Sequence, residues 1–195
     1  MAKVKPENED SPKREAILDA ALELFAELGY HGTTVPQVAD KAGVGAGTLY
    51  RYFENKEALV NALFQKWKRE LARQIMERFP VEQPVRTQFH EIWKRAAGFA
   101  TRHPRALDFL ELHHHGSYLD AASIAVEQEL LIPIYAFAEN AKRLQQLKEI
   151  SAEILGALVW GGFMGLVNAA RKGFVTLDKK TFDHAEECMW QAIRR

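Results

Sequence analysis

Side chains suited to phosphates and base edges gather in one short stretch of the sequence, residues 33–56. Its second half contains the hydroxyls of Thr48, Tyr50 and Tyr52, and the guanidinium of Arg51 lies among them. Proteins use such donors on nucleic-acid backbones and in the major groove, where a guanidinium bound to guanine discriminates between bases by roughly 1–3 kcal/mol. The chemistry that these residue types favour is therefore contact with DNA.

Two short helices joined by a tight turn are expected to position these side chains. Thr34 begins a Thr-x-x-Gln capping box, so a helix should start directly after it. Gly43 is placed to end that helix. The next helix is predicted over residues 45–53, with Leu49 and Phe53, four positions apart, directed to the core. This arrangement has the form of a helix-turn-helix, whose second helix enters the major groove.

Helical patterns also account for the rest of the chain. An amphipathic helix is predicted over residues 13–28 and should end at Gly29, and Asn55 suits the N-cap of a long helix that reaches about residue 79. Further helices are predicted over residues 85–102, 104–116, 119–147, 151–172 and 178–194. Pro133 should kink or divide the helix that contains it. No strand pattern of useful length is present, so the predicted fold class is all-α.

Composition and charge limit the classes of protein to which the sequence can belong. Its 195 residues are 47% apolar and 27% charged, as in ordinary soluble globular proteins. The formal net charge is zero, and residues 1–56 hold nine acidic residues against seven basic ones, so DNA binding must depend on where the basic residues lie. The single cysteine, Cys188, fits a reducing cytosol. With no secretion segment and no run of about 18 apolar residues, we expect a cytoplasmic protein and no membrane span.

Four sequence blocks follow one another at fixed spacing between residues 17 and 64. They are A-x-x-L-F-x-x-x-G-Y, T-T-V-x-x-V-A, A-G-V and G-T-L-Y-x-Y-F-x-N-K-E-x-L. In this run the sequence resembles the DNA-binding domain of the TetR family of transcriptional regulators. The resemblance implies an N-terminal three-helix helix-turn-helix domain at residues 12–58 and a larger C-terminal helical domain at residues 59–195 that binds a ligand and dimerises. The C-terminal part matches the family in size and helix order but not by motif.

Carried across position by position, the resemblance implies eight residues that contact DNA. They are Thr34, Ala46, Gly47, Thr48, Tyr50, Arg51, Tyr52 and Lys56. Thr34 and Lys56 would lie at helix N-termini, which favour phosphate on physical grounds as well. Ala46 and Gly47 can matter simply by being small enough for close approach. The family often has Ser where this chain has Gly45, so a hydroxyl for the helix cap and for a phosphate is absent here.

Glycines in the predicted helix 151–172 suggest close approach by another helix, because glycine inside a helix is less favourable than alanine by about 0.8–1 kcal/mol. The resemblance implies a four-helix bundle made by this helix and the last one with a second subunit. The residues expected in that dimer interface are Leu155, Val159, Gly162, Leu166, Phe182 and Met189. A twofold dimer would place two recognition helices on a pseudo-palindromic operator. In the alternative interpretation, the helix is only the core of the monomer.

Aromatic residues in the middle of the chain form the candidate effector pocket. The set comprises Phe89, Trp93, Phe109, His113, Tyr118, Phe137, Trp160 and Phe163. The resemblance implies a small apolar or amphipathic effector there, and packing of the aromatics in a core is the alternative. Three consecutive histidines begin at His113, but successive helical residues point about 100° apart and cannot share one face. We therefore expect no metal and no cofactor.

Together these features predict a homodimeric DNA-binding transcriptional regulator, most simply a repressor of a palindromic operator that an effector releases. An all-helical enzyme or ligand-binding protein that uses the aromatic and histidine region is one alternative, and a helical adaptor is another. No pairing of a nucleophile with a base stands out in the sequence. We therefore do not expect an enzyme.

Overall fold

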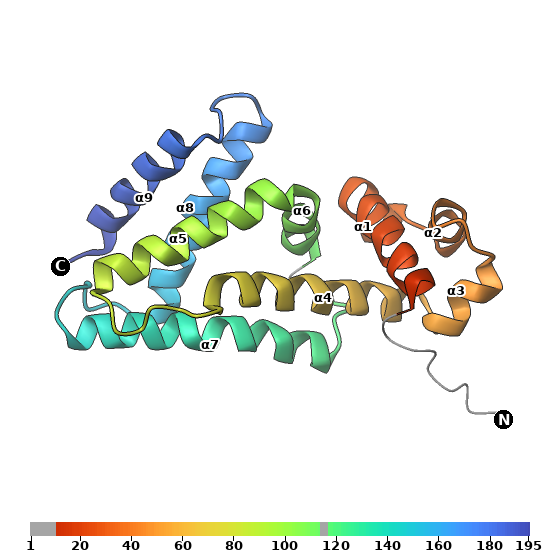
Figure 1. The fold of residues 1–195 in the computed structure, drawn as a ribbon, viewed down its shortest axis with the longest axis horizontal. Helices are drawn as coiled ribbons and strands as arrows, with labels where there is room; N and C mark the ends of the chain where they lie inside the picture. The colour runs from red at the N-terminus through yellow and green to blue at the C-terminus, as the bar shows by residue number, and fades with distance from the viewer. Residues whose placement is uncertain (1–10, 114–116) are drawn as a thin grey trace. The chain divides into compact units, whose positions relative to one another are not determined.

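The structure is a computed structural model that describes residues 11–113 and 117–195 (Figure 1). The helices of that part, in chain order, are α1 (Pro12–Gly32), α2 (Val35–Lys41), α3 (Ala46–Tyr52), α4 (Lys56–Met76), α5 (Val85–Arg102), α6 (Pro104–His113), α7 (Ala121–Arg143), α8 (Ala152–Arg171) and α9 (Lys179–Ile193). Within the described residues the only strand-like pairing is an isolated bridge between Leu147 and Arg194. The all-α prediction is confirmed. His114 and His115, considered for a metal site, lie outside the described residues.

Two compact units divide the chain. Unit 1 comprises Met1–Arg69 and His103–Glu127, and unit 2 comprises Glu70–Arg102 and Gln128–Arg195. The helices α4 and α7 therefore contribute residues to both units. The three-helix segment expected at residues 12–58 lies wholly in unit 1, which also includes α6.

The end of α1 is shaped by Gly29, which adopts a φ of 68°. Glycine favours this conformation because it has no Cβ, and the regular helix is interrupted there before one more turn. The side chain of Thr33, fully buried, donates to the carbonyl oxygens of Leu24 at 3.1 Å and Gly29 at 2.9 Å. These bonds tie the side chain of Thr33 to the last regular turns of α1. They also fix the chain where it enters α2.

The helix α2 is closed at both ends by local hydrogen bonds. The capping box is present: the amide of Gln37 donates to Oγ1 of Thr34 at 3.4 Å, and Oε1 of Gln37 accepts from the amide of Thr34 at 2.8 Å. Gly43, at a φ of 66°, ends the helix, and the amide of Val44 returns to the carbonyl of Ala39 at 3.0 Å. Both features were predicted, and together they set the turn that leads to α3 (Figure 1).

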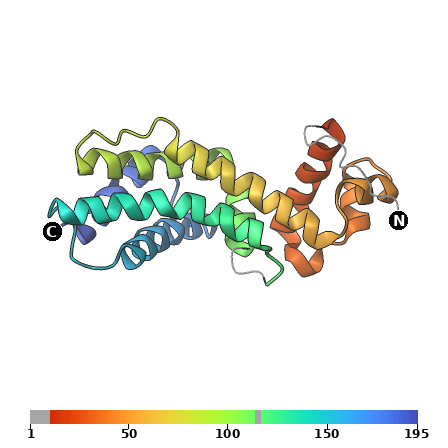
Figure 2. The same cartoon turned by 90° about the horizontal axis from the view of Figure 1, so that it is seen from below.

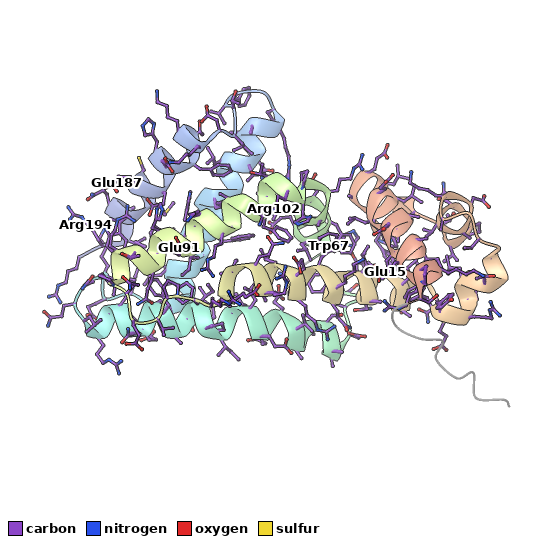
Figure 3. The ribbon with its side chains drawn as sticks, in the orientation of Figure 1. Glu15, Trp67, Glu91, Arg102, Glu187 and Arg194 are labelled. Carbon is purple, nitrogen blue, oxygen red and sulfur yellow. The ribbon has the colours of Figure 1, made fainter. Side chains whose placement is uncertain are left out.

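The short helix α3 is held from one side only. Leu49 and Phe53 are buried, as predicted, and the first residue of α3 follows Gly45, whose cap makes no side-chain hydrogen bond. Asn55 caps the next helix by accepting from the amide of Ala58 at 2.7 Å, so α4 starts where the sequence indicated. On α4, Lys66 pairs with Glu15 of α1, which is labelled in Figure 3.

Unit 2 is organised by contacts of α9 with α5 and α8. The carboxylate of Glu186, buried on α9, accepts two hydrogen bonds from Arg86, one of them 2.8 Å long. Arg86 also donates to Glu187, labelled in Figure 3, at 2.9 Å. The indole of Trp93 donates to the carbonyl of Phe182 at 3.0 Å. A forked guanidinium that meets a buried carboxylate in this way fixes α9 against α5.

The longest helix, α7, is not divided by its proline. Of the two outcomes expected at Pro133, a kink or a division, the division does not occur, and the helix runs from Ala121 to Arg143, as Figure 2 also shows. Proline removes one donor and leaves the carbonyl four residues earlier without a helical partner. That residue is Glu129, which is exposed, so water can satisfy its carbonyl.

Two helices, α7 and α8, contain long apolar windows. By length and composition alone, α7 and α8 could cross a membrane, with a mean hydropathy of 1.3 and 1.4 over their most apolar windows. Two such helices are a weak indication, because core helices pass the same test. Only 22% and 28% of those windows are buried. Both helices therefore carry apolar surface that their own chain leaves open.

Candidate nucleic-acid interface

The eight residues predicted to contact DNA come from three consecutive helix ends of unit 1. Thr34 caps the N-terminus of α2, Lys56 is the first residue of α4, and the other six all lie on α3. Because α2 and α3 contact each other and both contact α1, these helices form one packed group. The structure therefore brings Thr34 and the six residues of α3 together, and Lys56 contacts α1 through the ring of Tyr30.

The outer face of α3 is open. Tyr50 is 51% exposed, and Ala46, Gly47 and Arg51 are exposed as well, whereas Leu49 between them is fully buried. No atom lies within 4 Å of a Cβ placed on Gly47. The small size of Gly47 is therefore not required by packing within the protein. Its value lies in what can approach it from outside.

Two of the predicted contacts are engaged inside the protein. The hydroxyl of Tyr52 lies 2.8 Å from that of Ser11, and Nζ of Lys56 lies 4.1 Å from the centroid of the Tyr30 ring. Both side chains are half-buried, and burial lowers the pKa of Lys56. A phenol hydroxyl can accept further hydrogen bonds, and an ammonium has three donors, so neither group is used up.

The acidic excess of the first 56 residues does not lie on α3. The sequence of α3 is AGTLYRY, which contains one cation and no acid. On α1, Glu23 pairs with Lys41 at 2.7 Å, and a hydrogen bond from Lys41 holds the pKa of Glu23 below its ordinary value. This ion pair neutralises the charge of Glu23. The recognition helix therefore presents a locally basic and polar face although the chain has no net charge.

Sequence profiles identify the family of this fold. The profile described as "Bacterial regulatory proteins, tetR family" matches residues 17–63. A second profile, "Tetracyclin repressor-like, C-terminal domain", matches residues 64–195, which is more than half of the chain. The chain belongs to the TetR family. It is a DNA-binding transcriptional regulator.

Individual relatives agree with this assignment. The chain is 49% identical over 55 residues to the fatty acid metabolism regulator protein of Bacillus subtilis, a match that covers 28% of each protein. It is 37% identical over 90 residues to the HTH-type transcriptional repressor KstR2 of Rhodococcus jostii, covering 42% of this chain and 44% of that one. The chain thus spans less than half the length of these two relatives. Both are regulators rather than enzymes by name.

A solved structure extends the likeness to the whole chain. The TetR family transcription regulator from Marinobacter aquaeolei superposes with a TM-score of 0.84, covering 93% of this chain and 95% of that one. The identity is 21%, so this likeness concerns the fold alone. It shows that the helical region after the DNA-binding segment also has the TetR-type architecture.

The aromatic residues proposed for a TetR-type effector pocket are divided between the two units. Phe109, His113 and Tyr118 belong to unit 1, whereas the other five belong to unit 2. Those five are Phe89, Trp93, Phe137, Trp160 and Phe163. In unit 2, the first two and Phe163 are buried, and only Phe137 and Trp160 are half-buried. The buried rings of Phe89, Trp93 and Phe163 contact one another, and Phe137 and Trp160 each keep part of their surface exposed.

His113 is buried at the end of α6, with 1% of its surface exposed. Its ring lies 4.6 Å from that of Phe109 and 5.8 Å from that of Phe25, and its Nδ1 is hydrogen-bonded to the hydroxyl of Tyr118. Nε2 has no hydrogen-bond partner among the described residues. Burial lowers the pKa of His113 from 6.5 to about 4, with a weak opposing influence from the backbone of Phe25. The ring is therefore neutral at physiological pH.

The residues predicted for the dimer interface divide into two groups. Leu155 and Phe182 are buried within unit 2 and have little surface to offer a partner. Gly162 faces Met189 of the same chain, whose Cε would lie 2.2 Å from an added Cβ. Val159 and Leu166 are half-buried. Ile154 and Leu158, one position before Leu155 and Val159, are more than half exposed on α8.

Sequence reasoning missed two residues that hold the DNA-binding unit in place. Tyr30 lies between Lys56 and the ring of Tyr118. Asn61, 4% exposed, donates to the carbonyl of Tyr118 at 2.8 Å, and its Oδ1 accepts from the hydroxyl of Ser123 at 2.6 Å. A polar residue inside the apolar run of α4 was the signal that could have revealed Asn61. Tyr30 ends the block A-x-x-L-F-x-x-x-G-Y, but nothing near it in the sequence points to Lys56 or Tyr118.

Replacing His113 by Phe should make the stability of the protein less dependent on acid. The pKa of His113 is lower in the folded than in the unfolded chain, so its stabilising contribution is complete above about pH 6.5 and is lost as the pH falls toward 4. Between pH 7 and pH 5 the parent should lose about 2 kcal/mol more unfolding free energy than His113→Phe. Urea denaturation at fixed protein concentration measures this difference. Exposed His184→Gln is the control, and equal acid sensitivity of the parent and His113→Phe would contradict the assignment.

Proposed function

We propose that the protein is a homodimeric cytoplasmic repressor that binds a pseudo-palindromic operator in double-stranded DNA and is released by a small apolar or amphipathic effector. The observation that carries the DNA-binding part is the open, acid-free face of α3, where Tyr50 and Arg51 are exposed beside Gly47. The name of the repressor KstR2, similar over its matched segment, supports repression as the sign of regulation.

The geometry of α3 supports entry into the major groove. Leu49 and Phe53 fix one side of the helix to the protein, so the opposite side points outward as a unit. The major groove is about 12 Å wide and admits one helix, and small residues on the contacting face let the helix backbone come closer to the DNA. Ala46 and Gly47 occupy the first turn of α3 and leave that space open. Arg51 and Tyr50 then reach base edges and phosphates from the last turn.

Gly47→Leu tests this docking without disturbing the fold. The added side chain meets no protein atom within 4 Å of its Cβ, and leucine favours a helix over glycine by roughly 0.5–1 kcal/mol, so stability should be unchanged or higher. Affinity for a duplex recovered from a randomised library with the parent protein should fall by roughly tenfold or more, about 1.4 kcal/mol per factor of ten. Titration by fluorescence anisotropy at several salt concentrations measures it.

The matched control is Ala122→Leu, which places the same leucine side chain at an exposed position of α7 in the same unit. It should bind the selected duplex as the parent does. If Gly47→Leu also binds like the parent, α3 does not enter the groove with this face. If the parent selects no duplex at all, the proposed function itself is wrong.

An apolar stripe on α8 supports the dimer. Ile154 and Leu158 are 53% and 54% exposed, and nothing lies within 4 Å of a Cβ placed on Gly161 or Gly165. The spacing of these four residues puts them on one helix face. Covering each half-exposed aliphatic side chain is worth roughly 1–2 kcal/mol, and the glycines let a second helix come close. A second copy of α8 across a twofold axis satisfies both features.

Leu158→Glu should therefore convert the protein to monomers. A carboxylate at the centre of an apolar helix interface has no partner and loses its hydration, whereas in the free monomer it remains in water. Sedimentation velocity at micromolar concentration measures the change. Val81→Glu, which places the same charge at a 65% exposed position before α5, should remain dimeric. A monomeric parent, or a dimeric Leu158→Glu protein, would rule out this interface.

The half-buried side chain of Trp160 in unit 2 supports an effector with an apolar body. The ring of Trp160 stacks on Phe163 at 5.4 Å, and Phe163 lies 5.3 Å from Trp93 at an angle of 88°. A ligand that covers Trp160 would extend this aromatic row, which is the usual lining of small-molecule sites. The match to the fatty acid metabolism regulator covers only 55 residues. The chemistry of the effector therefore has to be found by experiment on this chain.

A thermal-shift screen of small apolar and amphipathic compounds should yield ligands that stabilise the protein. At a concentration one hundred times its dissociation constant, a single-site ligand adds about 2.7 kcal/mol to the unfolding free energy. Trp160→Leu should lose most of that gain, whereas Phe174→Leu, at a 77% exposed aromatic outside the row, should keep it. If a ligand stabilises both variants equally, the effector site does not include Trp160. If no compound stabilises the protein, the proposed effector is contradicted.

A further inference from the structure

The ammonium of Lys56 does not extend freely from the start of α4. Its Nζ lies 4.1 Å from the centroid of the Tyr30 ring, close enough for an attractive interaction between the charge and the ring face. Lysine has four rotatable side-chain bonds, so an unsupported ammonium samples many positions. Contact with a ring face restricts those positions while leaving N–H donors directed away from the ring.

Tyr30 is itself held by a second aromatic ring. The rings of Tyr30 and Tyr118 stack with centroids 4.0 Å apart and an interplanar angle of 17°. A parallel ring at that distance fills one face of Tyr30, so the ammonium at 4.1 Å must occupy the other face. Tyr30 is therefore the middle layer of a sandwich whose outer layers are Tyr118 and the charge of Lys56.

Tyr118 is held by two hydrogen bonds, one at its side-chain hydroxyl and one at its backbone carbonyl. Its hydroxyl is hydrogen-bonded to Nδ1 of buried His113, and its carbonyl accepts from Nδ2 of Asn61 at 2.8 Å. Asn61 lies on α4, five residues after Lys56. The three layers of the sandwich therefore come from α4 (Lys56), α1 (Tyr30) and the segment after α6 (Tyr118). Asn61 connects that segment back to α4. All of these residues belong to unit 1.

We propose that Tyr30 is a positioning residue for DNA binding: its ring, braced by Tyr118, holds the ammonium of Lys56 where it meets a phosphate of the operator. This inference rests on the proposed function, in which Lys56 contacts the DNA backbone. A cation that is ordered before binding loses less side-chain entropy when it binds phosphate. The aromatic face, rather than the Tyr30 hydroxyl, performs this role.

A double-mutant cycle between Tyr30 and Lys56 tests the proposal. The proteins are the parent, Tyr30→Leu, Tyr30→Phe, Lys56→Met and Tyr30→Leu/Lys56→Met, and the probe is the duplex that the parent recovers from a randomised library. Affinity is measured over a range of salt concentrations. The slope of log K against log salt counts phosphate contacts, at about 0.9 for each contact on duplex DNA.

Lys56→Met should reduce the slope by about 0.9 per subunit. Tyr30→Leu should lower the affinity by roughly three- to tenfold and shift the slope in the same direction, because the charge is still present but no longer held. Adding Tyr30→Leu to Lys56→Met should cause no further loss, and Tyr30→Phe should bind like the parent. A merely structural role for Tyr30 would instead weaken binding by the same factor in both Lys56 backgrounds.

A second measurement does not depend on DNA. In the free protein, the Cε protons of Lys56 should be shifted upfield by the ring current of Tyr30 in the parent and in Tyr30→Phe. In Tyr30→Leu that shift should be absent. Circular dichroism and thermal denaturation show whether each variant is folded, and if Tyr30→Leu is not, Tyr118→Leu, which removes the brace, replaces it with the same expected loss.

The outcomes separate the inference from its premise. If the parent selects no duplex, the proposed function fails and the inference with it. If the parent binds but Lys56→Met leaves affinity and slope unchanged, Lys56 is no phosphate contact and the inference is wrong while the function stands. If Lys56→Met reduces the slope and Tyr30→Leu acts additively, or if Tyr30→Phe is as damaging as Tyr30→Leu, Tyr30 does not position Lys56.

Discussion

The buried amide of Asn61 is the interaction on which the DNA-binding unit depends. Its Nδ2 donates to the carbonyls of Glu57 and Tyr118, and its Oδ1 accepts from the amide of Asp120 and the hydroxyl of Ser123. An amide has two donors and two acceptor positions, and here all four are used. Such a network has one satisfied geometry, and leaving any member unpaired is costly. It therefore fixes the start of α4, and with it Lys56, relative to the segment that follows α6.

Structural features that are formed by residues close together in the chain could be predicted from the sequence. The capping box at Thr34, the turn at Gly43 and the cap at Asn55 are made by neighbours in the chain, so their residue types indicate them directly. Burial of Leu49 and Phe53 follows from helical spacing. The eight proposed DNA contacts lie on these same helix ends, which is why one continuous stretch predicted the candidate interface.

Contacts between residues far apart in the chain could not be predicted from the sequence. Tyr30 meets Lys56 and Tyr118 across 26 and 88 positions, and no spacing rule links an aromatic residue in α1 to either. The division of the aromatic residues between two units depends on which helices pack together. Helical periodicity shows that a face is apolar but not whether α9 or a second chain covers it.

Because the chain has no net charge, the proposed positioning of Lys56 by Tyr30 and Tyr118 matters for its affinity for DNA. A strongly basic protein gathers DNA through many weakly placed cations, so the position of each one matters little. Here the pairing of Lys41 with Glu23 and of Lys66 with Glu15 removes two cations from that role. Affinity must then come from a few cations that are held in position before DNA arrives. An ordered Lys56 is one way to meet that requirement, and it explains why an aromatic face and a fully bonded asparagine support a single ammonium at the edge of the recognition helix.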